Sequence, residues 1–180
     1  MNALTRAALS TGFAGLVGLA AALPASAQAA PKLNDAEIAH VAVTANTVDI
    51  ENAQIAKKKA HSAAVREFAE TMIRDHTGVN KQAGDLAAKL HVTPQANAVS
   101  TSLVAGEKTA QGKFARVTGA AFDKEYMDNE IAYHQAVIDA VDKVLVPQTQ
   151  NAELKSLLTN VRPALVAHLD HAKMVRAGLK

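Results

Sequence analysis

The sequence predicts an all-α fold, a bundle of four long helices, and three observations support this. Apolar residues recur three or four positions apart over long stretches, which is the period of a helix with one buried face. No stretch shows the strict alternation of apolar and polar residues that is typical of a half-buried strand. Aromatic residues make up only 3% of the chain, so alanine, leucine and valine must build the core. Such small side chains favour close packing of helices.

The first 27 residues predict a cleavable signal peptide. Arg6 precedes an apolar run over residues 7–23, and Pro24 leads into the small residues 25–27, an Ala-x-Ala cleavage site. Glycines interrupt the apolar run, whereas a membrane-spanning helix needs about 20 apolar residues with anchoring flanks. We therefore expect export to the periplasm, a short tail over residues 28–33 and one bundle domain over residues 34–180. No membrane-spanning segment is expected after cleavage, and an association with the outer membrane stays open.

Composition excludes several classes of protein. The chain has 19 lysines and arginines and 17 acidic residues, so removal of Arg6 leaves the basic residues in excess by one. The charges are interspersed, and a nucleic-acid partner is not expected. The chain has no cysteine, which excludes a disulfide framework and a lipid-anchored N-terminal cysteine. A protein partner or a homo-oligomer remains open.

The first two helices are predicted as an antiparallel hairpin. Asn34 and Glu37 form a capping-box pattern that begins a helix over residues 35–59, and three lysines at its end complement the helix dipole. Ser62 can cap a second helix that continues to about His91, before Pro94. The very short connection between the two helices forces them to lie antiparallel.

The second half of the chain predicts another hairpin, reached by a long crossover. Residues 95–119 contain three glycines and are expected to form a crossover with a short helix. A third helix over residues 121–146 should end before Pro147, and a fourth over residues 151–177 should be kinked by Pro163. Two hairpins joined by a long crossover describe a ferritin-like four-helix bundle.

Ionisable side chains interrupt the apolar seam of every predicted long helix. Burying such groups is costly unless they are hydrogen-bonded, paired or bound to a metal. Glutamate and histidine are ligands that suit zinc, iron, manganese or copper, whereas calcium calls for more carboxylates. A di-iron centre would need four carboxylates, and the seams supply two. The residues predicted to converge as a metal site are Glu51, His76, Glu130, His134 and His168.

Three functional interpretations follow, in this order. The first is a periplasmic protein that binds a transition metal in the bundle core, for metal handling or envelope stress protection. The second is a metal-free structural or protein-interaction module of the cell envelope, in which the inward Glu and His side chains form a buried hydrogen-bond network. The third is a redox or hydrolytic enzyme. Because no nucleophile with an adjacent base and no cofactor fingerprint is present, such an enzyme would have to be metal-dependent. The sequence leaves open whether the protein is an enzyme.

Several short motifs resemble the bacterial domain of unknown function 4142 family. The resemblance covers nearly all of the chain after the predicted signal peptide. It implies an exported, ferritin-like helical protein, of a kind often described as an outer-membrane protein, and it implies no established reaction. The motifs are Glu51, the run Phe68-Ala69-Glu70-Thr71-Met72-Ile73-Arg74-Asp75-His76-Thr77, Phe122-Asp123-x-x-Tyr126 with the later His134, and Pro163 with His168-Leu169.

We predict that the exported protein begins at Gln28, because Ala25 and Ala27 offer the small side chains that signal peptidase requires. Cleavage after Ala29 is the rival register. The intact mass of the protein recovered from the periplasm checks this. A mass that retains residues 1–27 would contradict it.

Overall fold

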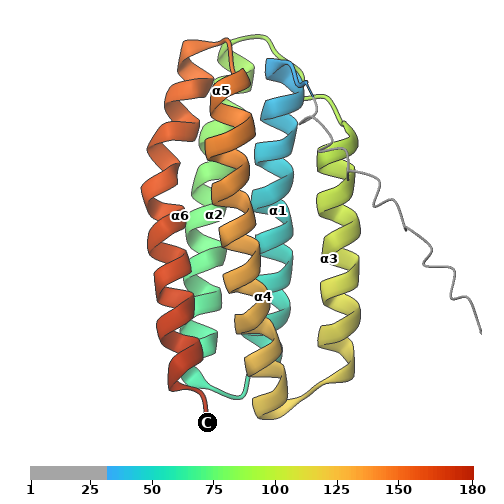
Figure 1. The fold of residues 1–180 in the computed structure, drawn as a ribbon, viewed down its shortest axis with the longest axis vertical. Coiled ribbons are helices and arrows are strands. Elements are labelled where there is room, and N and C mark those ends of the chain that lie inside the picture. The colour runs from blue at the N-terminus through green and yellow to red at the C-terminus, as the bar shows by residue number, and fades with distance from the viewer. Residues whose placement is uncertain (1–31) are drawn as a thin grey trace, which may run out of the picture.

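The computed structural model describes residues 32–180 and shows a helical bundle without a strand in that range (Figure 1). The predicted signal peptide and its cleavage site lie outside the described residues. No helix in residues 32–180 has both the length and the apolar character needed to cross a membrane. The elements are α1 (Asp35–Lys59), α2 (Ala63–Lys89), α3 (Ala98–Arg116), α4 (Gly119–Ala140), the π-helical turn η1 (Val141–Leu145), α5 (Val146–Gln148) and α6 (Ala152–Gly178).

Helices α1, α2, α6 and α4 surround one core. Helix α1 packs on α2 and α4, and α6 packs on α2 and α4, so the four close a ring. Helix α3 lies outside this ring, against α1 and α4, as the yellow-green helix on the right of Figure 1 shows. The core therefore lies among these four helices, and α3 covers only one side of the bundle.

The hairpin of α1 and α2 forms as predicted. Asn34 and Glu37 make the reciprocal hydrogen bonds of a capping box, and the bounds of α1 agree with the prediction. Ser62 is the N-cap of α2 by position, but its side chain makes no capping hydrogen bond. Instead the carboxylate of Asp123, on α4, accepts hydrogen bonds from the backbone amides of His61 and Ser62 at 2.9 and 2.7 Å. A residue from another helix thus holds this turn.

The expectation of a short helix in the crossover is wrong, because α3 extends over 19 residues. Asn97 accepts hydrogen bonds from the amides of Val99 and Ser100, and Ser100 completes a capping box that starts the helix firmly. Burial of Phe114 against the core offsets the weak helix propensity of the two glycines in α3.

The expected stop before Pro147 is also wrong. The helical path leaves α4 at Ala140, passes through the π-helical turn η1 and continues in α5 to Gln148. Pro147 is the second residue of α5, directly after the π-helical turn. Helix α6 runs through Pro163 as one element with Asn151 as its N-cap, and the kink at that proline stays a prediction.

Two apolar clusters fill the bundle, and a polar layer separates them. On α4, for example, Phe122 and Met127 belong to one cluster and Ile138 to the other, with Glu130 and His134 between them. The first cluster carries the large aromatic side chains, and the second is built from leucine, valine and isoleucine. The polar layer is therefore enclosed by apolar packing along the bundle axis.

We predict that Asp123→Ala lowers the free energy of unfolding by about 1.5–3 kcal/mol, because two amides lose a charged acceptor at a buried turn. Urea unfolding followed by circular dichroism measures this. Asp85→Ala is the control, since Asp85 pairs with Lys81 on an exposed helix face and should change stability by about 0.5 kcal/mol or less. Equal effects of the two substitutions would contradict the role given to Asp123.

Candidate metal centre

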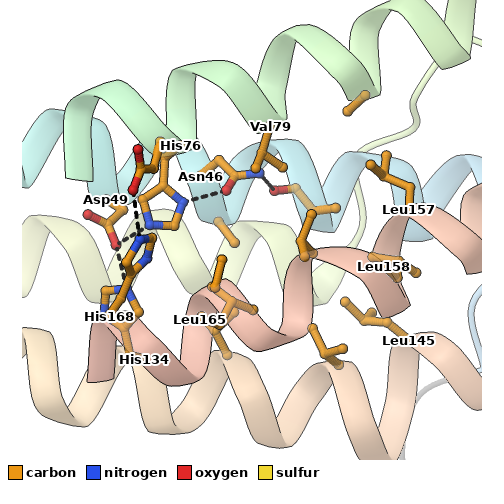
Figure 2. A pocket seen from close by; sticks show the side chains of 18 of the residues that line it. Asn46, Asp49, His76, Val79, His134, Leu145, Leu157, Leu158, Leu165 and His168 are labelled. Carbon is orange, nitrogen blue, oxygen red and sulfur yellow. Dashed lines mark hydrogen bonds and ion pairs between the residues drawn. The ribbon is translucent and has the colours of Figure 1, made fainter. Parts of the chain in front are cut away.

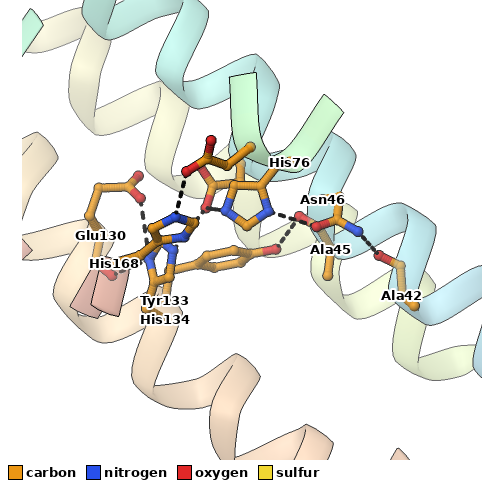
Figure 3. Close-up of polar contacts among 10 residues, drawn as sticks. Ala42, Ala45, Asn46, His76, Glu130, Tyr133, His134 and His168 are labelled. Carbon is orange, nitrogen blue, oxygen red and sulfur yellow. Dashed lines mark hydrogen bonds and ion pairs between the residues drawn. The ribbon is translucent and has the colours of Figure 1, made fainter. Parts of the chain in front are cut away.

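Three histidines from three helices meet in the polar layer. His76 on α2, His134 on α4 and His168 on α6 are 4%, 1% and 7% exposed. One ring nitrogen of each lies within 4.8 Å of the others, and the ring centroids are 5.2 to 5.7 Å apart. The rings turn toward one another in Figure 3. Such convergence of three imidazoles is typical of a metal centre.

Helix α1 orients the ring of His76. The Asn46 amide nitrogen donates to the carbonyl of Ala42 at 3.0 Å, so its amide oxygen faces His76. That oxygen lies 2.6 Å from His76 Nδ1 and can only accept a hydrogen bond. His76 therefore carries its proton on Nδ1, and Nε2 keeps a free lone pair. Figures 2 and 3 both show this chain of contacts.

The other two histidines are oriented in the same way. His134 Nδ1 lies 3.0 Å from the backbone carbonyl of Glu130, one turn earlier on α4. His168 Nε2 lies 3.1 Å from a carboxylate oxygen of Asp75, on α2. Both partners accept, so the proton sits on Nδ1 of His134 and on Nε2 of His168. Ligating histidines in metalloproteins commonly donate their second N–H to a carbonyl or carboxylate in this manner.

Asp49 on α1 faces two of the remaining ring nitrogens. Its Oδ2 lies 3.3 Å from His76 Nε2 and 3.5 Å from His134 Nε2. Within residues 32–180, neither carboxylate oxygen of Asp49 makes a hydrogen bond, nor do these two nitrogens or Nδ1 of His168. Buried polar atoms without partners are rare, and lone pairs that face one another repel unless a proton or a cation lies between them.

Burial raises the pKa of two carboxyl groups near the histidines, those of Asp49 and Glu130. The pKa of Asp49 rises to about 8 because the group is removed from water. Glu130 is fully buried as well, and burial followed by the nearby Asp49 raises its pKa well above the usual value. Its Oε2 lies 3.5 Å from His134 Nδ1, and Asp49, Glu130 and His134 form a second convergent group of ligand atoms.

Burial has the opposite effect on the histidines. It lowers the pKa of His76 to about 3 and that of His134 to about 4, since the charged imidazolium is penalised. The pKa of His168 is also lowered by burial, although Asp75 partly opposes this. Neutral imidazole is the form that binds a metal, so no proton has to be removed from these rings near neutral pH.

The structure brings four of the five predicted site residues together. His76, Glu130, His134 and His168 lie in the polar layer, whereas Glu51 does not. Glu51 is exposed on α1, and its carboxyl group lies near Glu107 on α3, where burial and then the nearby Glu51 raise the pKa of Glu107 to about 7. The expectation that Glu51 shares the core is wrong because the buried face of α1 is rotated from the one assumed.

Sequence reasoning missed the residues that complete the centre. Asp49 and Asn46 lie three positions apart on α1, and Asn52 continues the same buried face. The spacing of these polar residues on α1 was the available signal for a buried polar face. The prediction instead placed the buried face along the valines of this helix. Asp75 was placed away from the apolar face, and it reaches the site from the flank as the acceptor for His168.

The sequence matches the family described as "Domain of unknown function (DUF4142)" over residues 20–175. The chain belongs to this family. No curated protein matches it significantly.

One solved structure shares the fold of this DUF4142 protein. It is described as "CopM in the Cu(II)-bound form", with a TM-score of 0.62 and 15% sequence identity. The match covers 83% of this chain and 100% of that one. At this identity the likeness shows the fold alone.

We predict that the metal-free protein loses stability as the pH rises from about 6.5 to 8. In this window the unfolded chain has ionised Asp49 while the folded chain keeps its proton, so raising the pH favours unfolding. The histidines act in the opposite direction, but only below about 6.5, where the unfolded chain binds their protons. The expected slope is about 1.4 kcal/mol per pH unit for each such carboxyl group.

Asp49→Asn should make this slope shallower by the contribution of one carboxyl group, about 1.4 kcal/mol per pH unit. The exposed Asp85→Asn should leave the slope unchanged. Urea unfolding at a series of pH values measures both. If Asp49→Asn and the wild type share one slope, the carboxyl group of Asp49 does not hold a proton in the folded state.

Proposed function

We propose that this protein binds one transition-metal ion through His76, His134 and His168, with Asp49 as the oxygen ligand. One observation carries the proposal. Three buried imidazoles each give their N–H to an acceptor outside the centre and keep a lone pair, and two of these lone pairs face a buried carboxylate. A cation between them would remove the repulsion and satisfy atoms that otherwise lack partners.

The ligand set favours a borderline metal. Imidazole nitrogen suits zinc, copper, iron and nickel, and among divalent ions copper(II) binds nitrogen and oxygen ligands most tightly. The copper named in the description of the structural neighbour makes Cu(II) the first ion to test. Glu130 lies beside Asp49 and His134 and would supply a further oxygen ligand. Glu51 is left out of the proposed ligand set because it is exposed on another face of α1.

We place this function in the periplasm, as metal handling or protection of the envelope from metal stress. The predicted signal peptide over residues 1–27 supports export. We further propose that α1, α2, α4 and α6 form a ferritin-like four-helix arrangement with α3 added outside it. The closed ring of these four helices and the metal-ligand types in its core support that comparison.

A metal-free network is the second candidate, and one observation favours it. The raised pKa of Asp49 means that its carboxyl group is protonated at neutral pH and can donate to a histidine lone pair. Protons, and no metal ion, would then satisfy the histidine lone pairs. The protein would be a structural or interaction module. The two candidates differ in their response to added metal.

We predict that saturating Cu(II) raises the melting temperature of the metal-free protein by about 8–16 °C. Binding to the folded state alone at a thousandfold excess over Kd stabilises it by about 4 kcal/mol, and a chain of this size gains about 2–4 °C per kcal/mol. A chelator should reverse the shift. Differential scanning calorimetry on protein without a histidine tag measures it, with zinc(II) and iron(II) tested in parallel.

His76→Gln and His168→Gln should each abolish most of the shift, because each removes one ring nitrogen from the centre. His61→Gln and Glu51→Gln are the matched controls, since both residues are exposed and lie outside the convergent groups. A wild type whose melting is indifferent to every ion and to chelator would support the metal-free network instead.

A further inference from the structure

A narrow cavity adjoins the histidine cluster on one side. It has a volume of about 70 Å³ and lies between α1, α2, α6 and the region where α4 passes into η1. His76, His134, His168 and Asp49 line one end. Figure 2 shows Leu165, Leu158 and Leu145 extending away from the histidines along the opposite wall.

The wall of this cavity is almost wholly apolar. Beyond the histidine end it is formed by alanine, valine and leucine side chains from all four helices of the ring. Leu158 lies ten residues before His168 on α6, so the lining extends for about 15 Å along the helix axis. The lining extends from the ring edges of the histidines to leucines of α6 and η1.

The character of the wall selects the occupant. A water molecule needs two to four polar partners, and the apolar part offers none. The lining contains no lysine or arginine, and two aspartates stand at its polar end, so an anionic group is disfavoured. An apolar cavity of roughly 150 Å³ stays dry and binds benzene or xenon, and this one has about half that volume. Benzene is therefore too large, whereas a xenon atom or a diatomic gas fits.

We propose that this cavity binds a small, uncharged, apolar gas molecule of the size of dioxygen and holds it beside His76 and His168. The π-helical turn η1 contributes to this site. Val141 and Leu145 begin and end η1, and both face the cavity. Single π-helical turns occur frequently at functional sites, because they change the direction in which side chains point within a continuous helix.

Xenon is the probe for this proposal, used on the metal-free protein so that the result does not depend on metal binding. We expect saturable chemical-shift changes in ¹H–¹⁵N spectra under xenon pressure, largest around Val79, Val137 and Leu165. Benzene at its solubility limit should produce none. Absence of a saturable xenon response, or binding of benzene by the wild type, would overturn the proposal.

Substitutions on α2 locate the site. Ala83→Leu adds three carbons to a residue that lines the cavity and should weaken xenon binding by at least about tenfold. Ala88→Leu adds the same group to an exposed position on the same helix and should leave binding unchanged. If Ala83→Leu does not fold, Val79→Ile fills the cavity by one methyl group and should also weaken binding. Unchanged xenon affinity in a folded cavity-filling variant would exclude this cavity as the site.

Discussion

The burial of three neutral histidines beside Asp49 is the constraint on which the rest of this structure depends. Burying such groups is costly unless each polar atom finds a partner. One half of this need is met inside the protein, because each ring gives its N–H to a fixed acceptor. Two of these contacts join different helices, α1 with α2 and α2 with α6, and so they fix the register between them. The other half is the set of free lone pairs, and a metal ion would satisfy it.

The two apolar clusters give the centre two different sides. Toward one end of the bundle, Phe68 and Tyr126 pack edge to face and close the core with aromatic rings. Toward the other end the neighbours are aliphatic, and the narrow cavity lies among them. A ligand bound at the histidines would therefore have aromatic packing on one side and an apolar cavity on the other. Of the three histidines, His168 is the most exposed.

The sequence predicted the helices well where local signals are strong. The capping box at Asn34 defined the start of α1, and the lysines in the last turn defined its end, because these interactions lie within one turn of each helix end. It failed at α3, since the glycines weaken local propensity and the compensating burial of Phe114 is a tertiary effect. At Pro147 it failed because a π-helical turn lets the helical path continue, and no simple sequence rule predicts such a turn.

The candidate centre shows the same division. Histidines on apolar seams are conspicuous, and His76, His134 and His168 were predicted correctly to converge. On α1 the choice between Glu51 and Asp49 depended on the rotation of one helix, and two positions on a helix differ by more than half a turn. Asp75 joins the site from its flank through a contact with another helix, which periodicity cannot reveal.

The protonation state of the three rings tests this account most directly. Long-range ¹H–¹⁵N correlation spectra of the metal-free protein report which nitrogen of each histidine carries the proton. The structure requires the proton on Nδ1 of His76 and His134 and on Nε2 of His168. The proposed metal site predicts that the signals of the other ring nitrogens shift or broaden on addition of Cu(II). Doubly protonated rings near neutral pH, or protons on the nitrogens that face Asp49, would contradict it.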